Sequence, residues 1–502
     1  MSNLYNTLDG SILKKPGQYN LTDVVLVSYR SVRGDNVAEK IGIDSLVVDL
    51  NIYESIYNKT LSGNLVIGDA QNIVGKLPLT GNERLEFKLF TPSSPFGYDF
   101  SEKSGNPMYI YKITARTGLK PKVQGYMIHF CSKEMIENEL KVVSNAQLDT
   151  YSTMVANITK NPDFLGSKKN LFLEPSIGLH KHVFSRLRPF DCIDQVSQFT
   201  TSLKFNNSGY YFYETSRGFN YRSIESMLAV EANTARPSIA RFKPKPSNIS
   251  DEKGEKDIKT EMQIVMSYTI KDQFDTLKNL RNGVYASRLI THNQLDKTYT
   301  ETDFNYELEY EKIFHTETDK NGGKENEKGI LPKYIREGTS LTEYPESSLY
   351  LWPDTTNIHY TEQRNPVAIA DVKNIVQQRL SQRLAFSSFK VEIIVNGYTA
   401  IQAGDIITFE MPSYEPRDGN EPSDRDKYMS GRYLVTSVRH NINKSKKKHV
   451  MVLECMKDSV RSPYPSEIND TFIDKEKNNE GIIDQYEFDK AVIEGLGGKF
   501  FG

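Results

Sequence analysis

Two histidines, His180 and His182 in the sequence His-Lys-His, are the residues with the most direct chemical use, because neighbouring imidazoles can bind a metal ion weakly. The pair is isolated and no cysteine lies near it, so we interpret it as part of a surface strand. The three cysteines, Cys131, Cys192 and Cys455, are far apart and form no CxxC motif. This spacing argues against a disulfide framework and against structural zinc, and it fits assembly in a reducing cytoplasm.

Asp319, Asn321 and Gly322 resemble the start of a calcium-binding loop, but the twelfth position holds Ile330 where such a loop needs a glutamate. The sequence contains no HExxH, GxSxG or Walker motif. Acidic residues that lie close in sequence are interpreted as surface charges of helices or strands: Glu134 with Glu137, and Glu307 with Glu311. No pair resembles the two carboxylates of a glycosidase. We therefore expect no catalytic residue, no cofactor and no metal site.

The composition predicts a β-rich protein of two to four domains. The chain has 502 residues, of which 38% are hydrophobic and 25% are charged, with 29 tyrosines, 24 phenylalanines and one tryptophan. The net charge of −2 carries no global signature of nucleic-acid binding. No run of about 18 apolar residues occurs, and the first residues lack the form of a signal peptide, so we expect no membrane insertion.

Short strands separated by turn residues fill the region from position 23 to 134, a pattern typical of a small antiparallel barrel. Helical patterns follow at 135–148, 151–161 and 192–202. Strand patterns return at 263–270 and 283–293, and again after a predicted helix at 366–384. The strands that follow this helix are expected at 389–397, 405–412, 432–440 and 449–458. The polar stretches at 232–260 and 315–348 are expected to be loops, with the clearest loop signal at 318–329.

An aromatic hairpin at 203–228 stands between these regions. A turn signal at 206–209 precedes the run Tyr-Tyr-Phe-Tyr, and a second turn at 214–218 precedes Phe219 and Tyr221. Strands of this composition pair through bulky cross-strand side chains. An ordinary buried hairpin would explain the same residues, so the aromatic run alone does not identify a function.

The two β regions match each other in order and spacing, which indicates one barrel present twice. Gly81 precedes Arg-Leu-Glu-Phe-Lys-Leu, and Gly404 precedes Asp-Ile-Ile-Thr-Phe-Glu-Met. Further matches pair Tyr111, Ile113 and Thr114 with Tyr433, Val435 and Thr436; Met127, Cys131, Lys133 and Glu134 with Met451, Cys455, Lys457 and Asp458; and Ile52, Ile56, Leu61 and Gly63 with Ile270, Phe274, Leu280 and Gly283. The equivalence of Cys131 and Cys455 suggests a role in barrel packing. Three such chains would present six barrels around one axis.

The hairpin Asn-Asn-Ser-Gly-Tyr-Tyr-Phe-Tyr-Glu-Thr-Ser-Arg-Gly-Phe-Asn-Tyr, together with the string from 395 to 458, resembles the baseplate hub proteins of contractile-tailed phages. These are also similar to the N-terminal part of type VI secretion spike proteins. The resemblance covers most of 20–460. It implies an α+β, β-dominated fold with two homologous antiparallel barrels, the tube domains. A peripheral α/β domain is inserted between and within them.

The resemblance also implies the partners. It implies a homotrimer with a pseudo-sixfold face that docks the hexameric tail tube, and an opposite face that holds a trimeric central spike of oligosaccharide-binding-type fold, with or without a lysozyme. Neighbouring baseplate proteins would bind as well, and DNA would pass through the opening on ejection. The hub would lie in the virion tail baseplate after assembly in the host cytoplasm. It would have no catalytic activity.

We expect an N-terminal arm at 1–20, a first barrel at 21–148, a peripheral domain at 149–261 and 301–387, a second barrel at 262–300 and 388–460, and a tail at 461–502. The tail would anchor the spike or a neighbour, or remain disordered. Residues expected to pack the peripheral domain on a barrel or to shape turns are Gly209, Tyr211, Phe212, Tyr213, Gly218, Phe219, Tyr221, Gly404, Asp405 and Gly431. The alternatives are a type VI secretion-like spike protein and a hub fused to a cell-wall hydrolase. No spare region of about 100 residues remains for such a domain.

Overall fold

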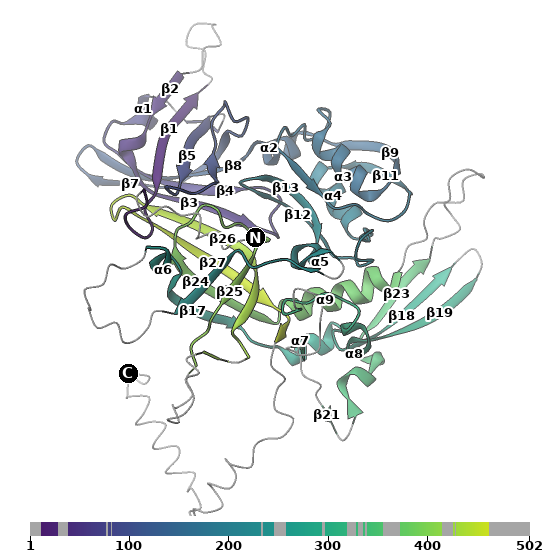
Figure 1. Ribbon diagram of the computed structural model, residues 1–502. Helices are drawn as coiled ribbons and strands as arrows, with labels where there is room; N and C mark the ends of the chain where they lie inside the picture. The colour runs from purple at the N-terminus through teal and green to yellow at the C-terminus, as the bar shows by residue number, and fades with distance from the viewer. Residues whose placement is uncertain are drawn as a thin grey trace, which may run out of the picture. The chain divides into compact units, whose positions relative to one another are not determined.

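The computed structural model describes residues 12–28, 39–76, 79–81, 83–231, 234–244, 258–293, 297–318, 328–329, 335–336, 339–354, 372–413, 425–426 and 428–460 (Figure 1). By its contacts the chain divides into Met1–Arg461 and Ser462–Gly502. Every described helix and strand belongs to the first of these units. The predicted tail, most of the predicted arm and most of the rejected calcium loop after position 318 lie outside the described residues.

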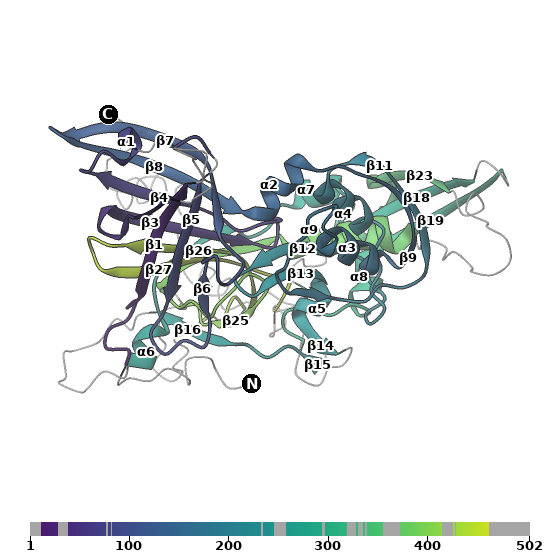
Figure 2. The same ribbon diagram turned by 90° about the horizontal axis from the view of Figure 1, so that it is seen from above.

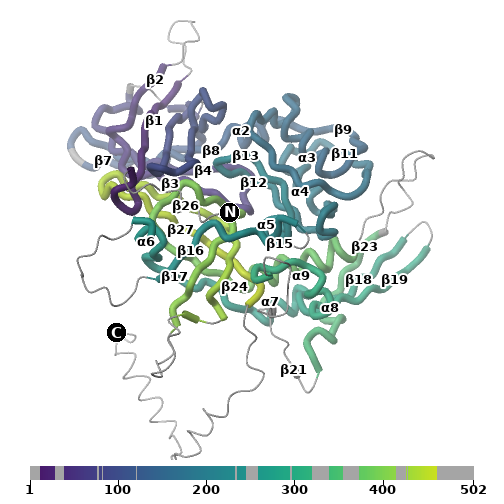
Figure 3. Tube along the Cα trace, viewed as in Figure 1, coloured from purple at the N-terminus to yellow at the C-terminus, as the bar shows by residue number. Residues whose placement is uncertain are grey.

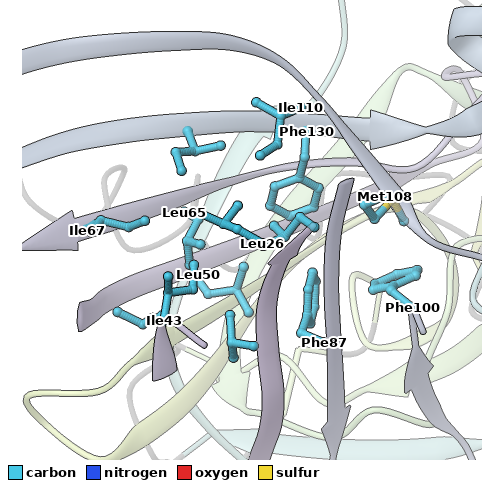
Figure 4. Close-up of a cluster of buried hydrophobic side chains, with 14 of the residues drawn as sticks. Leu26, Ile43, Leu50, Leu65, Ile67, Phe87, Phe100, Met108, Ile110 and Phe130 are labelled. Carbon is cyan, nitrogen blue, oxygen red and sulfur yellow. The ribbon is translucent and has the colours of Figure 1, made fainter. Parts of the chain in front are cut away.

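Alternating apolar residues give the first barrel its strands, because every second side chain of a strand points to the same face. Its six main strands are β1 (Asn20–Ser28), β3 (Val47–Ser55), β4 (Ser62–Asp69), β5 (Arg84–Phe90), β7 (Met108–Lys120) and β8 (Val123–Ser132). They are hydrogen-bonded in the order β1-β5-β7-β8-β4-β3, with β2 (Glu39–Gly42) beside β1 and β6 (Gly97–Asp99) beside β5. Their inward side chains form one cluster that includes Leu26, Leu65, Phe87 and Phe130 (Figure 4).

The second barrel is a closed ring of strands. Its members are β16 (Ala240–Pro244), β17 (Ile264–Asp272), β24 (Phe389–Asn396), β25 (Ile406–Phe409), β26 (Gly431–Asn443) and β27 (Lys448–Lys457). The order is β16-β25-β26-β27-β24-β17, and β17 pairs with β16 to close the ring. Its core side chains, among them Val391, Ile393, Leu453 and Cys455, are fully buried.

The two strand orders are the same when β1, β3, β4, β5, β7 and β8 are matched with β16, β17, β24, β25, β26 and β27. The predicted duplication is therefore present in the topology. One strand differs in direction, because β1 runs antiparallel to β5 whereas β16 runs parallel to β25. Strand β16 lies in the stretch expected to be an exposed loop. Its lysines and prolines hid a strand whose inward Ala240 and Phe242 are buried.

Shared β-bulges fix which residues of the two barrels correspond. Strand β7 slips register against β8 between Ile110 and Lys112, and β26 slips against β27 between Val435 and Ser437. Ile110, paired with Phe130, therefore corresponds to Val435, which is paired with Cys455.

A second shared bulge lies between Val47 and Asp49 of β3 and between Val265 and Ser267 of β17. Bulges are single inserted residues that persist in related strands, so two coincidences of this kind support a duplication.

The residue matches made from sequence were right for Ile52 and Ile270 but shifted elsewhere. Cys455 corresponds to Phe130 and not to Cys131, and Tyr433 corresponds to Met108 and not to Tyr111. The matches of Met127, Lys133 and Glu134 are each displaced by one residue. Leu61 and Gly63 belong to the turn before β4 and to β4, whose counterpart is β24, so their matches to Leu280 and Gly283 are wrong.

A peripheral domain follows the first barrel. It contains α2 (Lys133–Leu140), β9 (Val143–Asp149), α3 (Tyr151–Lys160), β10 (Leu171–Leu173), β11 (His180–Leu187), α4 (Pro189–Ser197), β12 (Tyr210–Thr215), β13 (Gly218–Ser223) and α5 (Ile224–Leu228). The helix expected at 135–148 ends at Leu140, because the alternation in Val143–Asp149 suits a strand that pairs with β11. The predicted hairpin is confirmed as β12 and β13.

A second insertion separates β17 from β24 (Figure 3). It contains α7 (Thr276–Arg281), β18 (Ala286–Asn293), β19 (Thr298–Asn305), β23 (Leu349–Asp354), a π-helical turn (Asn374–Gln378) and α9 (Arg379–Phe386). Strand β18 was expected in the second barrel, but it pairs with β19 and β23 in a separate sheet. The insertion therefore begins after β17. The predicted helix at 366–384 is helical where it is described.

Short elements complete the described chain: the 3-10 turns Asp44–Leu46, Leu341–Glu343 and Pro345–Ser347, α1 (Ile73–Lys76), β14 (Ala229–Glu231), β15 (Thr234–Ala235), α6 (Ile258–Met262), α8 (Tyr306–Tyr310), β20 (Lys328–Gly329), β21 (Ile335–Arg336), β22 (Thr339–Ser340) and β28 (Ser459–Val460). The fold is thus α+β and β-dominated, with two barrels of one topology and inserted α/β parts, as predicted.

Candidate functional site at the junction of the two barrels

The two barrels share one continuous sheet, because β3 of the first barrel pairs with β26 of the second. The antiparallel ladder runs from Ser55 opposite Ser437 to Asp49 opposite Asn443. Strand β26 is long enough to serve both barrels, since its first residues pair with β25 and its later ones with β3 on the same side. Figure 2 shows the resulting order β7, β8, β4, β3, β26 and β27.

An amide row, Asn64, Asn51 and Asn441, crosses this junction on the face that points away from both cores. The amide nitrogen of Asn441 donates to Asn51 Oδ1 at 2.9 Å, and that of Asn51 donates to Asn64 Oδ1 at 2.9 Å. The row is flanked by Arg439, whose Nε donates to Asn51 Oδ1, and by Asp49, which accepts from Asn441. Asn51 is buried, so the partly exposed amides of Asn64 and Asn441 form the surface of the junction, with charges of both signs beside them.

The aromatic hairpin packs on the junction with its two faces in different cores. Phe212 stacks on Phe219 at 5.1 Å between ring centroids, and with Tyr221 they join the helices of the peripheral domain. Tyr211 and Tyr213 point the other way, into a cluster that contains residues of β25, β26 and β27. Alternation of side chains along a strand gives one hairpin these two contacts.

The predicted glycines lie at the ends of strands, in the hairpin and in the second barrel. Gly209 precedes β12 and Gly431 begins β26. Gly218 has φ +133° and approaches the backbone of Asn170 so closely that a Cβ would overlap it. Gly404 has φ +87° and a Cβ there would overlap the Tyr213 hydroxyl. The structure thus brings Gly404 and Tyr213 together; that these residues hold the peripheral domain on the barrels stays a prediction.

Asp405 caps the turn that leads into β25. Its Oδ2 accepts a hydrogen bond from the backbone N–H of Gln402 at 3.0 Å. Burial raises the pKa of Asp405, opposed chiefly by the positive charge of Arg217. Glu83 occupies the corresponding place before β5, since its carbonyl accepts from Ile110 as that of Asp405 accepts from Val435. The duplication therefore includes an acidic residue before this strand.

Glu54 ties three parts of the molecule to one buried carboxylate. It accepts from the Tyr98 hydroxyl at 2.6 Å, from the backbone N–H of Ser216 at 3.0 Å and from that of Ala403 at 3.2 Å. Ser216 is at the tip of the hairpin, and Ala403 precedes β25. Burial raises the pKa of Glu54 to about 7, even though these three hydrogen bonds favour the ionised form.

Two buried histidines extend this network into the second barrel. Since the Tyr98 hydroxyl donates to Glu54, it must accept from His440 Nε2, which lies 2.9 Å away. His440 Nδ1 is then the acceptor for His449 Nε2 at 3.0 Å. Burial lowers the pKa of His449 to about 3 and that of His440 well below its usual value, so both rings are neutral. The network is a chain of neutral hydrogen bonds that ends on Glu54.

A buried ion cluster joins the hairpin to α2, and one of its members also reaches the first barrel. Lys169 Nζ lies 2.6 Å from Glu134 Oε2 and 2.6 Å from Glu214 Oε1. Glu214 also accepts from the backbone N–H of Leu61, the residue before β4. Glu134 was expected on the surface, but its side chain is only 4% exposed, because the lysine compensates its charge in the interior. Glu137, its predicted companion, instead pairs with Lys133 and Lys141.

The segment 315–318 was expected in a polar loop, yet it is buried against the end of β27. The imidazole Nδ1 of His315 lies 2.8 Å from Asp458 Oδ2, and Glu317 Oε1 lies 3.2 Å from Lys457 Nζ. Polar residues can be buried here because each finds a partner of opposite charge or a hydrogen bond.

The residues first singled out for chemistry form no common site, although the rings of His180 and His182 both lie beside Tyr151. His180 and His182 are half-buried on β11, where the His180 ring stacks on Tyr151 at 4.0 Å. The three cysteines are buried thiols, and Glu307 and Glu311 are exposed at α8. Over the described ranges, no three His, Cys, Asp or Glu side chains gather as metal ligands. None of the helices described there is long and apolar enough to span a membrane.

Sequence reasoning missed Glu54, Tyr98, Lys169, His440 and His449. Each is a polar residue in or beside an apolar strand, which is the signal that could have drawn attention to them. Their partners are far away in sequence, so spacing carried no information about the network.

No protein-family model matches the chain, and no curated protein matches it in sequence. Among solved structures it is similar to the 43 kDa tail protein of prophage MuSo2 from Shewanella oneidensis. The identity is 8%, the match covers 88% of this chain and 98% of that chain, and the TM-score is 0.47.

It is also similar to the prophage tail protein gp18 from Listeria monocytogenes, with 9% identity, 92% and 100% coverage and a TM-score of 0.40. An E. coli component of the type VI secretion system matches with 7% identity, 84% and 76% coverage and a TM-score of 0.37. These structures come from the two groups of proteins that the sequence resemblance named, phage tails and type VI secretion.

Proposed function

We propose that this chain is the central hub of a phage tail baseplate, a homotrimer in which six barrels form a ring. The observation that carries the proposal is internal to the chain: two barrels of the same strand order share one sheet through the β3–β26 ladder. When the relation between the two barrels repeats from one chain to the next, the barrels follow one another around an axis. Three chains then give six similar barrels.

Such a ring resolves a mismatch of symmetry. Its six barrels present a nearly sixfold face to a hexameric tail tube protein. Its three peripheral domains and its true threefold axis suit a trimeric central spike of oligosaccharide-binding-type fold on the opposite face. Neighbouring baseplate proteins would bind the peripheral parts, which lie outside the barrel sheets.

In the proposed ring the amide row lines the central opening, through which DNA would pass. A row of basic side chains would bind phosphates and make passage dependent on salt, because each contact releases counterions. Asn51, Asn64 and Asn441 are uncharged, and the charges beside them, Arg439 and Asp49, have opposite signs. A surface of this kind holds a polyanion weakly.

The protein would act in the virion tail after assembly in the host cytoplasm, and it would have no enzymatic activity. The ionisable groups at the junction support this role, since Glu54, Lys169 and Glu214 each have buried partners that hold them in place. A type VI secretion-like spike is the alternative. It would bind a secretion tube in place of a phage tail tube.

Particle images of the purified full chain test the proposal. A ring with six similar inner lobes and threefold outer features is the expected result, and added tube and spike proteins should bind opposite faces. Particles without a ring, under conditions where tube and spike are folded, would contradict it. Hydrolysis of peptidoglycan by the pure chain would overturn the structural role.

A further inference from the structure

Two strand edges lack the partner that their counterparts have. Strand β26 pairs with β25 and then with β3 along one side, whereas its counterpart β7 pairs with β5 only through Met108 and Tyr109 on that side. Strand β3 pairs with β26 from Asp49 to Ser55, whereas its counterpart β17 pairs with β16 only through Ile264 and Val265. Within the described part of the chain, no strand covers the rest of either edge.

The side chains at these edges are exposed where the matching ones are buried. Ile52 of β3 is 0% exposed, but its counterpart Ile270 of β17 is 41% exposed. Thr436, the bulged residue of β26, is 0% exposed, but the bulged residue of β7, Tyr111, is 51% exposed. Phe274, just past the end of β17, is 68% exposed. Apolar side chains in this arrangement mark an interface that another chain covers.

We infer that β7 of one chain pairs with β17 of a second copy of this chain, repeating between chains the ladder that β26 and β3 make within one. The inference rests on the proposed ring and identifies the strands that close it. The two edges lie at opposite ends of the run β7-β8-β4-β3-β26-β27-β24-β17, so one chain cannot pair them with each other without closing this sheet on itself (Figure 1). Within the chain the counterpart of β7 pairs with the counterpart of β17 and not with a second copy of itself. The contact between chains is therefore head-to-tail.

The repeat also predicts the register. Asn441 pairs with Asn51 within the chain. Through their neighbours on β8 and β24, these residues correspond to Thr117 and Thr269. In the same way the pair Arg439 and Tyr53 predicts Thr114 opposite Asp272.

Both edges carry one additional residue between these two positions. Strand β7 slips against β8 between Thr114 and Thr117, and β17 slips against β24 between Ile270 and Asp272. Neither β26 nor β3 has a slip at the corresponding place. Because each edge gains one residue in the same interval, the number of residues between the two predicted pairs stays equal on both strands. Two unrelated edges would have no reason to match in this way.

Cysteine crosslinking of the full chain tests the register. Thr117→Cys combined with Thr269→Cys places two thiols directly opposite, at a distance that permits a disulfide. Oxidation should convert most chains to covalent dimers and trimers on a non-reducing gel. The matched control, Thr117→Cys with Asp272→Cys, shifts one thiol by three residues, about 10 Å along the strand, and should give none. The native cysteines are buried, which limits competing disulfides.

A charge at the edge provides a second test that does not require new disulfides. Ile270→Lys should lower the trimer association constant at least tenfold and leave the melting temperature of the monomer unchanged, since this side chain is already half-exposed. Met266→Lys is the control, because Met266 is equally exposed at 41% and corresponds to Val48, which stays 39% exposed beside β26. The control should assemble normally.

The outcomes separate the inference from the proposed function. Trimers of normal mass that neither crosslink through Thr117 and Thr269 nor respond to Ile270→Lys would refute the β7–β17 contact and leave the ring standing. Chains that remain monomeric at every concentration, alone and with spike protein, would refute both. In-register crosslinking with loss of assembly in Ile270→Lys supports both.

Discussion

Replacing Lys169 by methionine should weaken the attachment of the hairpin to α2. The lysine side chain is 6% exposed, and the two carboxylates it joins, Glu134 and Glu214, are 4% and 2% exposed. Burial alone would raise the pKa of Glu134, but its contacts with Lys169 and Ser167 together lower it. Methionine has nearly the same length and no charge, so the substitution removes the ammonium without leaving a large cavity.

The structure gives the magnitude. The two carboxylate oxygens each lie 2.6 Å from Nζ, so they are at most about 5 Å apart. At an effective dielectric constant of about 20, two unit charges at this separation repel by about 3 kcal/mol. Breaking a buried ion pair by removing one partner costs about 3–5 kcal/mol in comparable proteins. We therefore expect Lys169→Met to lower stability at pH 7 by about 3–5 kcal/mol.

The loss should depend on pH in a defined direction. Without the lysine, the folded-state pKa of the carboxylates rises above the unfolded value. The folded chain then binds protons that the unfolded chain has lost, so stability falls as pH rises above about 4.5. Lowering the pH from 8 toward 5 should restore part of the stability of the variant. Adding Glu214→Gln to Lys169→Met should restore part of it at all pH values.

Several parts of the chain can unfold separately, so the assay must be local. Hydrogen exchange of the amides in α2 and β12 reports the opening of this junction, with thermal melting as a second measurement. Lys181→Met, at an exposed site on β11, is the matched control and should change neither. A loss below about 1 kcal/mol, or a loss that is the same at pH 5 and pH 8, would refute the reasoning.

Three further substitutions test the junction. Burial holds the pKa of His449 near 3, so as the pH falls from about 6.5 toward 3 the unfolded chain binds a proton that the folded chain does not, which costs the native chain up to about 1.4 kcal/mol of stability per pH unit. The variant His449→Gln should therefore lose stability less steeply over this range. Denaturant melts measure the two curves, and parallel curves would contradict the prediction. Gly404→Ala should lower stability by about 1–3 kcal/mol, because alanine is strained at the positive φ of this position and its Cβ would overlap the Tyr213 hydroxyl. Adding Tyr213→Phe removes that hydroxyl and should restore part of the loss, so additive shifts of the melting temperature in the double variant would contradict the contact. Phe219→Ala should cost about 3–5 kcal/mol, since its ring is fully buried against Phe212; calorimetry that shows less than about 1 kcal/mol would place the hairpin outside the core.

Much of the fold could be predicted because strands with one buried face show an alternation of apolar and polar residues in the sequence. The sequence Arg-Leu-Glu-Phe-Lys-Leu-Phe predicted β5 to the residue, and the order of similar strands predicted the duplication. Residue matches failed because like residues were aligned with one another: Tyr433 corresponds to Met108, three residues before Tyr111, and Cys455 corresponds to Phe130, one residue before Cys131. A shift by an odd number of residues exchanges the inward and outward faces of a strand. Strand β16 was missed because its apolar positions are few and lie among lysines and prolines.

The candidate site could be predicted only in part. The aromatic run of β12 identified the hairpin because it lies between two turn signals, at 206–209 and 214–218. The ion cluster of Lys169 and the hydrogen-bond network that joins Glu54 to His449 could not be predicted. The residues of each are far apart in sequence and meet only in the tertiary structure. Charged residues in sequence look like surface residues unless the partner is known, which explains the error for Glu134.

The mass of the native assembly tests the ring most directly. Native mass spectrometry of the full chain, alone and with spike protein, should show a species at three times the chain mass of 57.3 kDa. Ile270→Lys should shift it to the single-chain mass, and Met266→Lys should not. A species of one or two chains at all concentrations, with spike protein present, would contradict a ring built from six barrels.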